Sequence, residues 1–464
     1  MRGGPAILAV ALAALFAACG SSQPPPGSTL NGTFRDPDGD GVLARAPGEP
    51  LADRTDLAPA GRVARTLTTL AVIADAHVTD EESPLRAEVL DRLGGDVSSA
   101  FRPQESLTTQ VLAAAVDAVD AEQPDLVLVE GDLVDNAQAN EEAWASTVLR
   151  GGVVRPDSGR RGYAGLQAAT SPDPFIWRPD VDAPRHPGLL AAAQEPFRSA
   201  GLHAPWVRLL SNHDVSVQGV IAPDTELSAF AQGTRKLAGL ERWVPDVVRS
   251  GEAGAARAAR DAITDPDAPT ITVPPDPDRR IEPATATPLD RQLAPNVWLI
   301  GADTADREGG AEGVVTADEL AALGNRLRSH PGGRFLIAAS SPLEETVGGD
   351  AVLALLDRTP GVLAVLAADT HRNQVRPHGH YWLIRSPSLV DWPQQVRMLR
   401  VVQLDDGRLA LETWLVDHAG RDGAAGYLGL AGSARDLAYL DPQGGRPRIS
   451  AGSALDRNVR LYLP

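Results

Sequence analysis

From about residue 66 onward, short runs of apolar residues alternate with stretches in which apolar residues recur at helical spacing. The runs at residues 67–74, 125–130 and 206–210 are rich in Leu and Val, which is typical of buried strands. Between the first two, residues 104–122 place their apolar side chains on one helical face, so a helix is predicted there. This alternation predicts an α/β fold.

The second half of the chain continues the pattern. Strands are predicted at residues 297–302, 335–339, 362–367, 381–384, 396–404 and 409–416, and helices at residues 316–329 and 351–356. The last strands follow one another without helices. An Asp406-Gly407 turn between the final two predicts a β-hairpin.

Two long stretches, residues 137–204 and 216–294, interrupt the pattern with Pro and Gly and no clean period. We interpret both as insertions over the functional face of one domain that spans residues 61–440. The segment before it, residues 20–60, is then a tether and N-terminal extension. Residues 441–464 form a C-terminal tail.

The charge balance is acidic, with 61 Asp and Glu against 43 Lys and Arg and a net charge of -18. The basic side chains are almost all Arg, because Lys236 is the only Lys in the chain. A surface of this sign does not neutralise a phosphate backbone, so no nucleic acid partner is expected. Solubility is the simpler explanation of the charge.

The N-terminus is typical of a targeting segment. Arg2 precedes an apolar run at residues 6–18, which has the length of a signal-peptide core and is too short to span a bilayer. Cys19 follows small residues and is the only Cys in the chain, so it is the expected lipidation site of a lipoprotein signal peptide at residues 1–19. A buried core Cys is the alternative. Lipidation predicts an exported protein held on the outer face of the bacterial cell membrane or in the periplasm, with the membrane as a partner through its lipid anchor.

Polar residues follow four of the predicted strands directly. The runs are Asp75-Ala76-His77, Gly131-Asp132-Leu133-Val134-Asp135-Asn136, Ser211-Asn212-His213-Asp214 and Ala368-Asp369-Thr370-His371-Arg372-Asn373. Ligands gather at the carboxyl ends of strands in α/β sheets, and mixed carboxylate, imidazole and amide groups suit Zn, Mn or Fe. Each run alone also fits a solvated loop, a turn or a helix cap. Their order and their placement at strand ends favour a metal site.

With these four runs the chain resembles the calcineurin-like metallophosphoesterases, and more closely an exported bacterial branch with long inserts. Further stretches that support the resemblance are Phe101-Arg102-Pro103-Gln104-Glu105, Val154-Arg155-Pro156-Asp157-Ser158-Gly159, Val217-Gln218-Gly219, Asp391-Trp392-Pro393-Gln394-Gln395 and Asp417-His418. The resemblance covers about residues 50 to 440 and implies a four-layer α/β/β/α sandwich.

The resemblance also implies roles for single residues. The first metal site would be formed by four side chains: Asp75, His77, Asp132 and His371. Asp132 would bridge to a second metal site, where Asn212 is a ligand. His213 would contact the phosphate and assist the leaving group, with Asp214 orienting its ring.

The chain departs from the family pattern at the second metal site, where two histidines are expected. One position is occupied by Ser340-Ser341-Pro342 and the other by Asp369. Asp369 still offers carboxylate oxygen, whereas serine is a poor neutral ligand. Such a site would favour Mn, Mg or Ca, while Mn, Zn or Fe would suit the first.

Three interpretations follow from this departure. The chain is a phosphomonoesterase or phosphodiesterase with a harder metal at the second site, a one-metal enzyme, or a surface binding protein that has lost catalysis. We favour a metal-dependent phosphoric ester hydrolase, because the first site and His213 are intact. Its expected partner is a phosphate-ester small molecule or an envelope phosphate.

Overall fold

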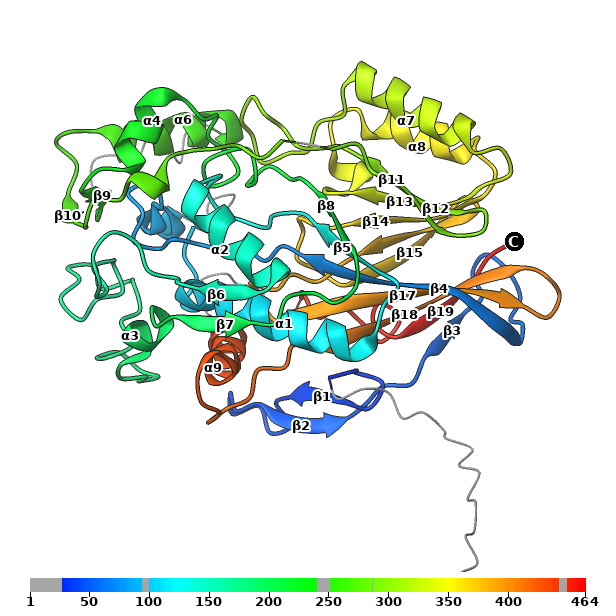
Figure 1. The fold of residues 1–464 in the computed structure, drawn as a ribbon, viewed down its shortest axis with the longest axis horizontal. Coiled ribbons are helices and arrows are strands. Elements are labelled where there is room, and N and C mark those ends of the chain that lie inside the picture. Colours follow the sequence, from blue (N-terminus) through cyan, green and yellow to red (C-terminus); the bar gives the residue numbers. More distant parts are fainter. Residues whose placement is uncertain (1–26, 94–99, 240–250, 286, 442–448) are drawn as a thin grey trace, which may run out of the picture.

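The computed structural model describes residues 27–93, 100–239, 251–285, 287–441 and 449–464 (Figure 1). The predicted signal peptide and Cys19 lie outside the described residues. Within the described part, no helix combines the length and the apolarity needed to cross a bilayer.

One sheet has seven strands, and three of them carry site loops. In spatial order these are β3 (Ala52–Arg54), β19 (Val459–Tyr462), β18 (Leu409–Asp417), β17 (Gln395–Leu404), β4 (Val63–Ala74), β5 (Leu126–Glu130) and β8 (Trp206–Leu209). Strands β4, β5 and β8 are parallel, so their carboxyl ends meet at one edge of the sheet. Strand β17 pairs antiparallel with both β4 and β18.

The other large sheet has six strands. Their order is β11 (Asp290–Ala294), β12 (Val297–Ala302), β13 (Arg334–Ala339), β14 (Val362–Ala367), β16 (Tyr381–Arg385) and β15 (Gln374–His378). The four strands from β12 to β16 are parallel, and antiparallel strands close both edges.

Alternate residues of the strands face different parts of the core. In β4, Leu70 and Val72 join an apolar cluster that takes residues from both large sheets. Ala71 and Ile73 face the other way, toward a cluster with α1 (Thr108–Glu122), α2 (Ala139–Arg150) and α9 (Tyr427–Leu440). On the six-stranded sheet, the outward face packs against α7 (Ala317–Ser329) and α8 (Gly349–Asp357), as Figure 1 shows. Side chains alternate between the two faces of a strand, and apolar clusters cover both faces of each large sheet.

The remaining elements lie mostly in the insertions and at the N-terminus. They are α3 (Leu189–Ala193), α4 (Thr225–Ala231), α6 (Gly251–Thr264), the strand pairs β1 (Gly32–Arg35) with β2 (Ala44–Pro47), β6 (Gly152–Val154) with β7 (Phe197–Ser199) and β9 (Arg235–Leu237) with β10 (Thr270–Thr272), and the 3₁₀ turns Glu88–Leu93, Glu105–Leu107, Pro277–Arg279 and Leu343–Glu345. A separate apolar cluster joins residues 85–90 and 100–101 to the second insertion, with Phe101, Leu237 and Ile263 among its members.

The predicted α/β class is confirmed, and the strands predicted at 297–302 and 362–367 coincide with β12 and β14. Helix α2 was not predicted, although Ala145, Val148 and Leu149 of this helix enter the main core. Its first turn is polar, which hid the apolar face. Strands β11 and β15 were also missed, because edge strands with exposed residues show no apolar run.

Candidate metal centre

Four loops at strand ends meet in one place. Asp75 and His77 follow β4, and Asp132 follows β5. His213 follows β8, and His371 follows β14 of the other sheet. Ligand atoms of Asp75, His77 and His371 lie within 4.8 Å of one another, and those of His77, Asp132 and His213 do so as well. The two groups share His77.

The backbone at these loops is unusual. Asp75, His77, Asp369 and His371 have φ angles of 47°, 43°, 67° and 54°, in the left-handed region that non-glycine residues rarely adopt. Gly131 has a φ of 79°, and a Cβ there would lie 2.2 Å from Asp75 Oδ1. Such conformations cluster at functional sites, where the surroundings hold the strained residues in place.

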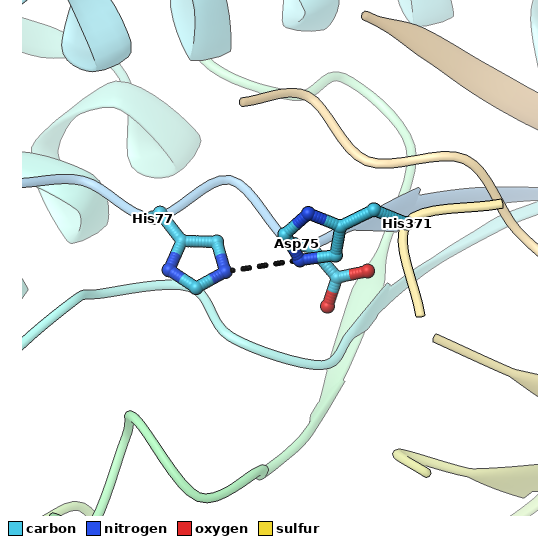
Figure 2. A group of neighbouring side chains, drawn as sticks. All are labelled: Asp75, His77 and His371. Carbon is cyan, nitrogen blue, oxygen red and sulfur yellow. Dashed lines mark hydrogen bonds between the residues drawn. The ribbon is translucent and has the colours of Figure 1, made fainter. Parts of the chain in front are cut away.

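The rings of His77 and His371 face each other through their Nε2 atoms, which are 3.3 Å apart (Figure 2). On the opposite side of each ring, Nδ1 meets a carboxylate. His77 Nδ1 lies 3.1 Å from Asp135 Oδ1, and His371 Nδ1 lies 2.6 Å from Asp391 Oδ2. When Nδ1 donates its hydrogen to a carboxylate, the Nε2 lone pair is left to bind a metal.

The ionisation of Asp135 supports this tautomer of His77. Burial alone would raise the pKa of Asp135, but Arg86, His213 and His77 together hold it well below its usual value. An ionised carboxylate only accepts hydrogen bonds, so His77 Nδ1 is the donor. Asp391 is paired in turn with Arg102, whose Nε lies 2.8 Å from Asp391 Oδ1.

Three carboxylates crowd the same space. Burial and the charges of Asp132 and Asp369 raise the pKa of Asp75 well above its usual value. Burial raises the pKa of Asp132 to about 6, and burial with the Asp132 charge raises that of Asp369 to about 7. Burial and the neighbouring His213 lower the pKa of His77 well below its usual value. A bound cation would favour the ionised form of these carboxyl groups and lower their pKa values.

The donor set fits a divalent metal ion. Two nitrogen ligands of a tetrahedral zinc stand about 3.3–3.4 Å apart, and the Nε2 atoms of His77 and His371 have this spacing. Asp75 adds carboxylate oxygen, and Asp132 Oδ2 lies 3.7 Å from His77 Nε2. Asp75, His77 and His371 therefore form one candidate ligand group, and Asp132 lies with His77 in the other. A carboxylate lies behind each of the two facing histidines.

His213 lies beside this group. Its ring centroid is 4.6 Å from that of His77, and its Nδ1 lies 2.8 Å from the carbonyl oxygen of Asp135. Burial alone would lower the pKa of His213, but the Asp132 and Asp135 carboxylates raise it to about 9. At neutral pH the ring is therefore cationic.

Asp214 does not contact the His213 ring, which the family resemblance had implied that it orients. Its carboxylate accepts hydrogen bonds from the backbone N–H groups of Leu133, Val134 and Ser211 at 3.0, 3.3 and 3.1 Å, and Arg208 pairs with it at 2.7 Å. The group in contact with the His213 ring is Asp135, at the end of the same loop as Asp132. Asp214 therefore shapes the loop that carries Asp132.

The residues expected at a second metal site do not form a ligand group among the described residues. Asn212 donates from Nδ2 to the carbonyl of Gly219 at 3.0 Å, and its Oδ1 accepts from Ser211 Oγ at 2.9 Å. Ser340 is fully buried, with its hydroxyl 2.6 Å from that of Thr304. Asp369 belongs to neither ligand group found among the described residues, although its charge acts on Asp75.

The sequence contained Asp135 and Asp391 within its motifs but gave no reason to assign them. Asp135 is three residues from Asp132, a spacing that puts both on one loop. Asp391 meets His371 only through the fold. The Arg86 and Arg102 side chains behind these two carboxylates carried no sequence signal of their role.

No family model matches the sequence, and no curated protein matches it. Among solved structures, one titled "Structure of PhoD" is 11% identical, with 86% of this chain and 80% of that chain covered and a TM-score of 0.31. A putative 5'-nucleotidase from Staphylococcus aureus, in complex with alpha-ketoglutarate, is also 11% identical. It covers 79% of this chain and 58% of that one, with a TM-score of 0.33. At these TM-scores the likeness adds nothing to the geometry of the site.

Proposed function

We propose that the chain is a metal-dependent phosphoric ester hydrolase of the calcineurin-like type, built on a four-layer α/β/β/α sandwich. One observation carries the proposal: His77 and His371 turn their Nε2 atoms toward each other at 3.3 Å while carboxylates hold their Nδ1 atoms. With both Nδ1 atoms donating to carboxylates, the two Nε2 lone pairs are free to bind one cation. Asp75 and Asp132 supply the negative charge that such a cation needs.

In this proposal, Asp75, His77, Asp132 and His371 hold a divalent ion, with Mn, Zn or Fe as the candidates. A bound ion would supply positive charge for the phosphate group and activate a water molecule. The chain's own residues do the rest. Gly131 allows the Asp75 carboxylate to approach the loop backbone, and the Asp132 backbone N–H faces Asp75 Oδ1 at 3.4 Å.

His213 is the proposed acid. Its cationic ring can donate a hydrogen bond to a phosphate oxygen, and it can pass a proton to the ester oxygen as the phosphorus–oxygen bond breaks. The Asp135 carbonyl, 2.8 Å from Nδ1, leaves Nε2 as the donor toward substrate. Contacts with the Asp135 carboxylate and carbonyl would hold the proton on the ring before the reaction.

A non-catalytic binding protein is the second candidate, and Ser340 is the observation that favours it. The Ser340 hydroxyl is engaged with Thr304, so it offers little to a second ion. Asn212 and Asp369 could still hold Mn, Mg or Ca, because both offer oxygen. Hydrolysis with one bound metal, or with a weakly held second metal, would identify an enzyme, whereas a binding protein would show no hydrolysis.

We also propose that the mature protein is anchored through a lipid on Cys19, outside the cytoplasmic membrane. Support comes from the apolar run that precedes this Cys. A phosphate-ester small molecule or an envelope phosphate would then be the substrate.

The test begins with residues 20–464, purified and stripped of metal. Mn, Zn, Fe, Mg and Ca are added back singly, and metal per chain is measured beside hydrolysis of a phosphomonoester and a phosphodiester. We expect bound metal and hydrolysis in the wild type and neither in Asp75→Ala. His203→Ala, which changes an exposed histidine, is the matched control. Absence of both metal and hydrolysis with every ion would exclude the enzyme.

A further inference from the structure

Lys236, the only lysine in the chain, is completely buried in β9 of the second insertion. Its Nζ donates to Glu88 Oε1 at 2.8 Å and to the carbonyl oxygens of Ser83 and Arg86 at 2.9 and 2.7 Å. These contacts use all three donors of the ammonium group. A buried charge is tolerated only with such partners, so the contacts hold the backbone at Ser83 and Arg86 in place.

The Arg86 side chain forms the next link. It is buried, and its guanidinium spans two carboxylates, with Nη2 2.7 Å from Glu105 Oε2 and Nη1 2.8 Å from Asp135 Oδ2. Charge-assisted bonds from a planar guanidinium fix direction as well as distance. A shift of the Arg86 backbone would therefore move the Asp135 carboxylate.

Asp135 contacts both rings that matter most for the proposed function. Its Oδ1 lies 3.1 Å from His77 Nδ1, and its carbonyl oxygen lies 2.8 Å from His213 Nδ1. The third ring, that of His371, is held by Asp391, which pairs with Arg102. His371 is not independent of the first branch, because its Nε2 lies 3.3 Å from His77 Nε2 and the Arg102 backbone N–H donates to the same Glu105 oxygen as Arg86. His418 contacts Gln394 and Arg435 instead, so its ring is the internal reference for a change that begins at Lys236.

We propose that Lys236 is a positioning residue, which sets the orientation of His77 and His213 through Arg86 and Asp135. The inference rests on the proposed function only in treating these rings as site residues. It gives the second insertion a role: the β9–β10 pair braces the segment behind the metal centre. A purely structural lysine would stabilise the fold without influencing particular rings.

The direct test is NMR of the imidazole nitrogens in the metal-free full chain, labelled with ¹⁵N-histidine. Nine histidines are present, and His→Gln variants assign the signals. In Lys236→Met we expect the His77 and His213 signals to shift more than that of His371, while that of His418 stays. Leu237→Ala is the matched control, because Leu237 is the equally buried neighbour that packs in the apolar cluster. Unchanged His77 and His213 signals, or equal shifts at all four rings, would overturn the proposal.

A reciprocal measurement avoids any change at Lys236. Because the chain has one lysine, ¹⁵N-lysine labelling gives one Nζ signal. Arg86→Gln and Asp135→Asn should shift this signal, whereas Asp391→Asn, which connects to Arg86 only through Arg102 and Glu105, should shift it less. A signal that does not respond to Arg86→Gln and Asp135→Asn would refute the coupling, even where Lys236→Met fails to fold.

Metal affinity gives a third readout in protein that binds metal. Loss of an outer-shell partner typically weakens metal binding about 10–100-fold, so Lys236→Met should weaken it by about tenfold. Leu237→Ala should lower the melting temperature and leave affinity within about twofold. Equal affinity in both variants would contradict a positioning role. Failure of the proposed hydrolysis is seen separately, as inactivity of the wild type, and leaves the NMR result to decide on Lys236.

Discussion

The residues expected at a first and at a second metal site have different surroundings. At the first, His77 and His371 each present one nitrogen to the centre and hold the other against a carboxylate. At the second, the polar atoms of Asn212 and Ser340 bond to neighbouring protein groups. This difference shows that the hydrogen-bond partners of a side chain decide whether its nitrogen or oxygen atom is left to bind a metal ion.

The two sets of residues also differ in the charges that they carry. The first site brings buried carboxyl groups with raised pKa values close to His77, whose pKa is lowered by burial. Ser340 and Thr304 form a neutral pair that is satisfied without any ion. The first-site residues therefore offer ligand atoms to a metal ion, whereas the Ser340 hydroxyl is already hydrogen-bonded to Thr304.

Replacement of His77 should reduce metal affinity more than any other change considered, because both ligand groups contain this residue. In His77→Ala we expect metal affinity to fall by more than about 100-fold, beyond the range for outer-shell partners. Equilibrium dialysis with Zn or Mn measures the change, and the exposed His203 gives the control variant His203→Ala. Stoichiometric metal in His77→Ala would place the ion elsewhere.

Asp391→Asn should produce the next largest effect. The Asn side chain keeps the shape but can no longer accept as a carboxylate from His371 Nδ1, at present 2.6 Å away. We expect affinity to fall about 10–100-fold with the fold retained. Thr304→Val, which removes the hydroxyl paired with Ser340, should leave affinity unchanged if the first site dominates. Similar losses in both variants would argue against unequal sites.

Much of this centre could be predicted because its ligands follow apolar strands directly. The strands β4, β5, β8 and β14 fall where apolar runs lie in the sequence, and their polar ends mark one edge of an α/β fold. Local pattern marked the loops that carry Asp75, His77, Asp132 and His371, whereas their assignment to one metal site came from the family resemblance.

The outer partners could not be predicted in the same way. Arg102 and Asp391 are 289 residues apart and meet only in the fold. Asp214, adjacent to His213, was the local choice for orienting the ring, yet its carboxylate turns to the backbone of Leu133 and Val134. Sequence proximity gave no information on which carboxylate faces which ring.

A smaller effect is expected at Gly219, which separates catalysis from metal binding at the first site. A Cβ at Gly219 would lie 2.4 Å from His213 Nε2 and 2.5 Å from Asn212 Nδ2, and the φ of 71° adds strain for any other residue. In Gly219→Ala we expect kcat to fall about tenfold, since small displacements of a reacting group are costly, while metal affinity at the first site stays within about twofold. Gly188→Ala is the matched control, because Gly188 has a φ of 80° but open space around its Cβ position. Equal kcat values in the two variants would remove His213 from the reaction.

Ser340→His tests whether the second site can be restored by its missing residue type. Ser340 is fully buried and its hydroxyl is bonded to Thr304, so an imidazole there would overpack the strand end. We expect a loss of about 1–3 kcal/mol in unfolding free energy and no additional metal per chain. Thermal unfolding and metal analysis measure both. A second tightly bound ion in Ser340→His would instead mean that the surrounding groups, Asn212 and Asp369 among them, are still arranged for metal and that only the ligand was lost.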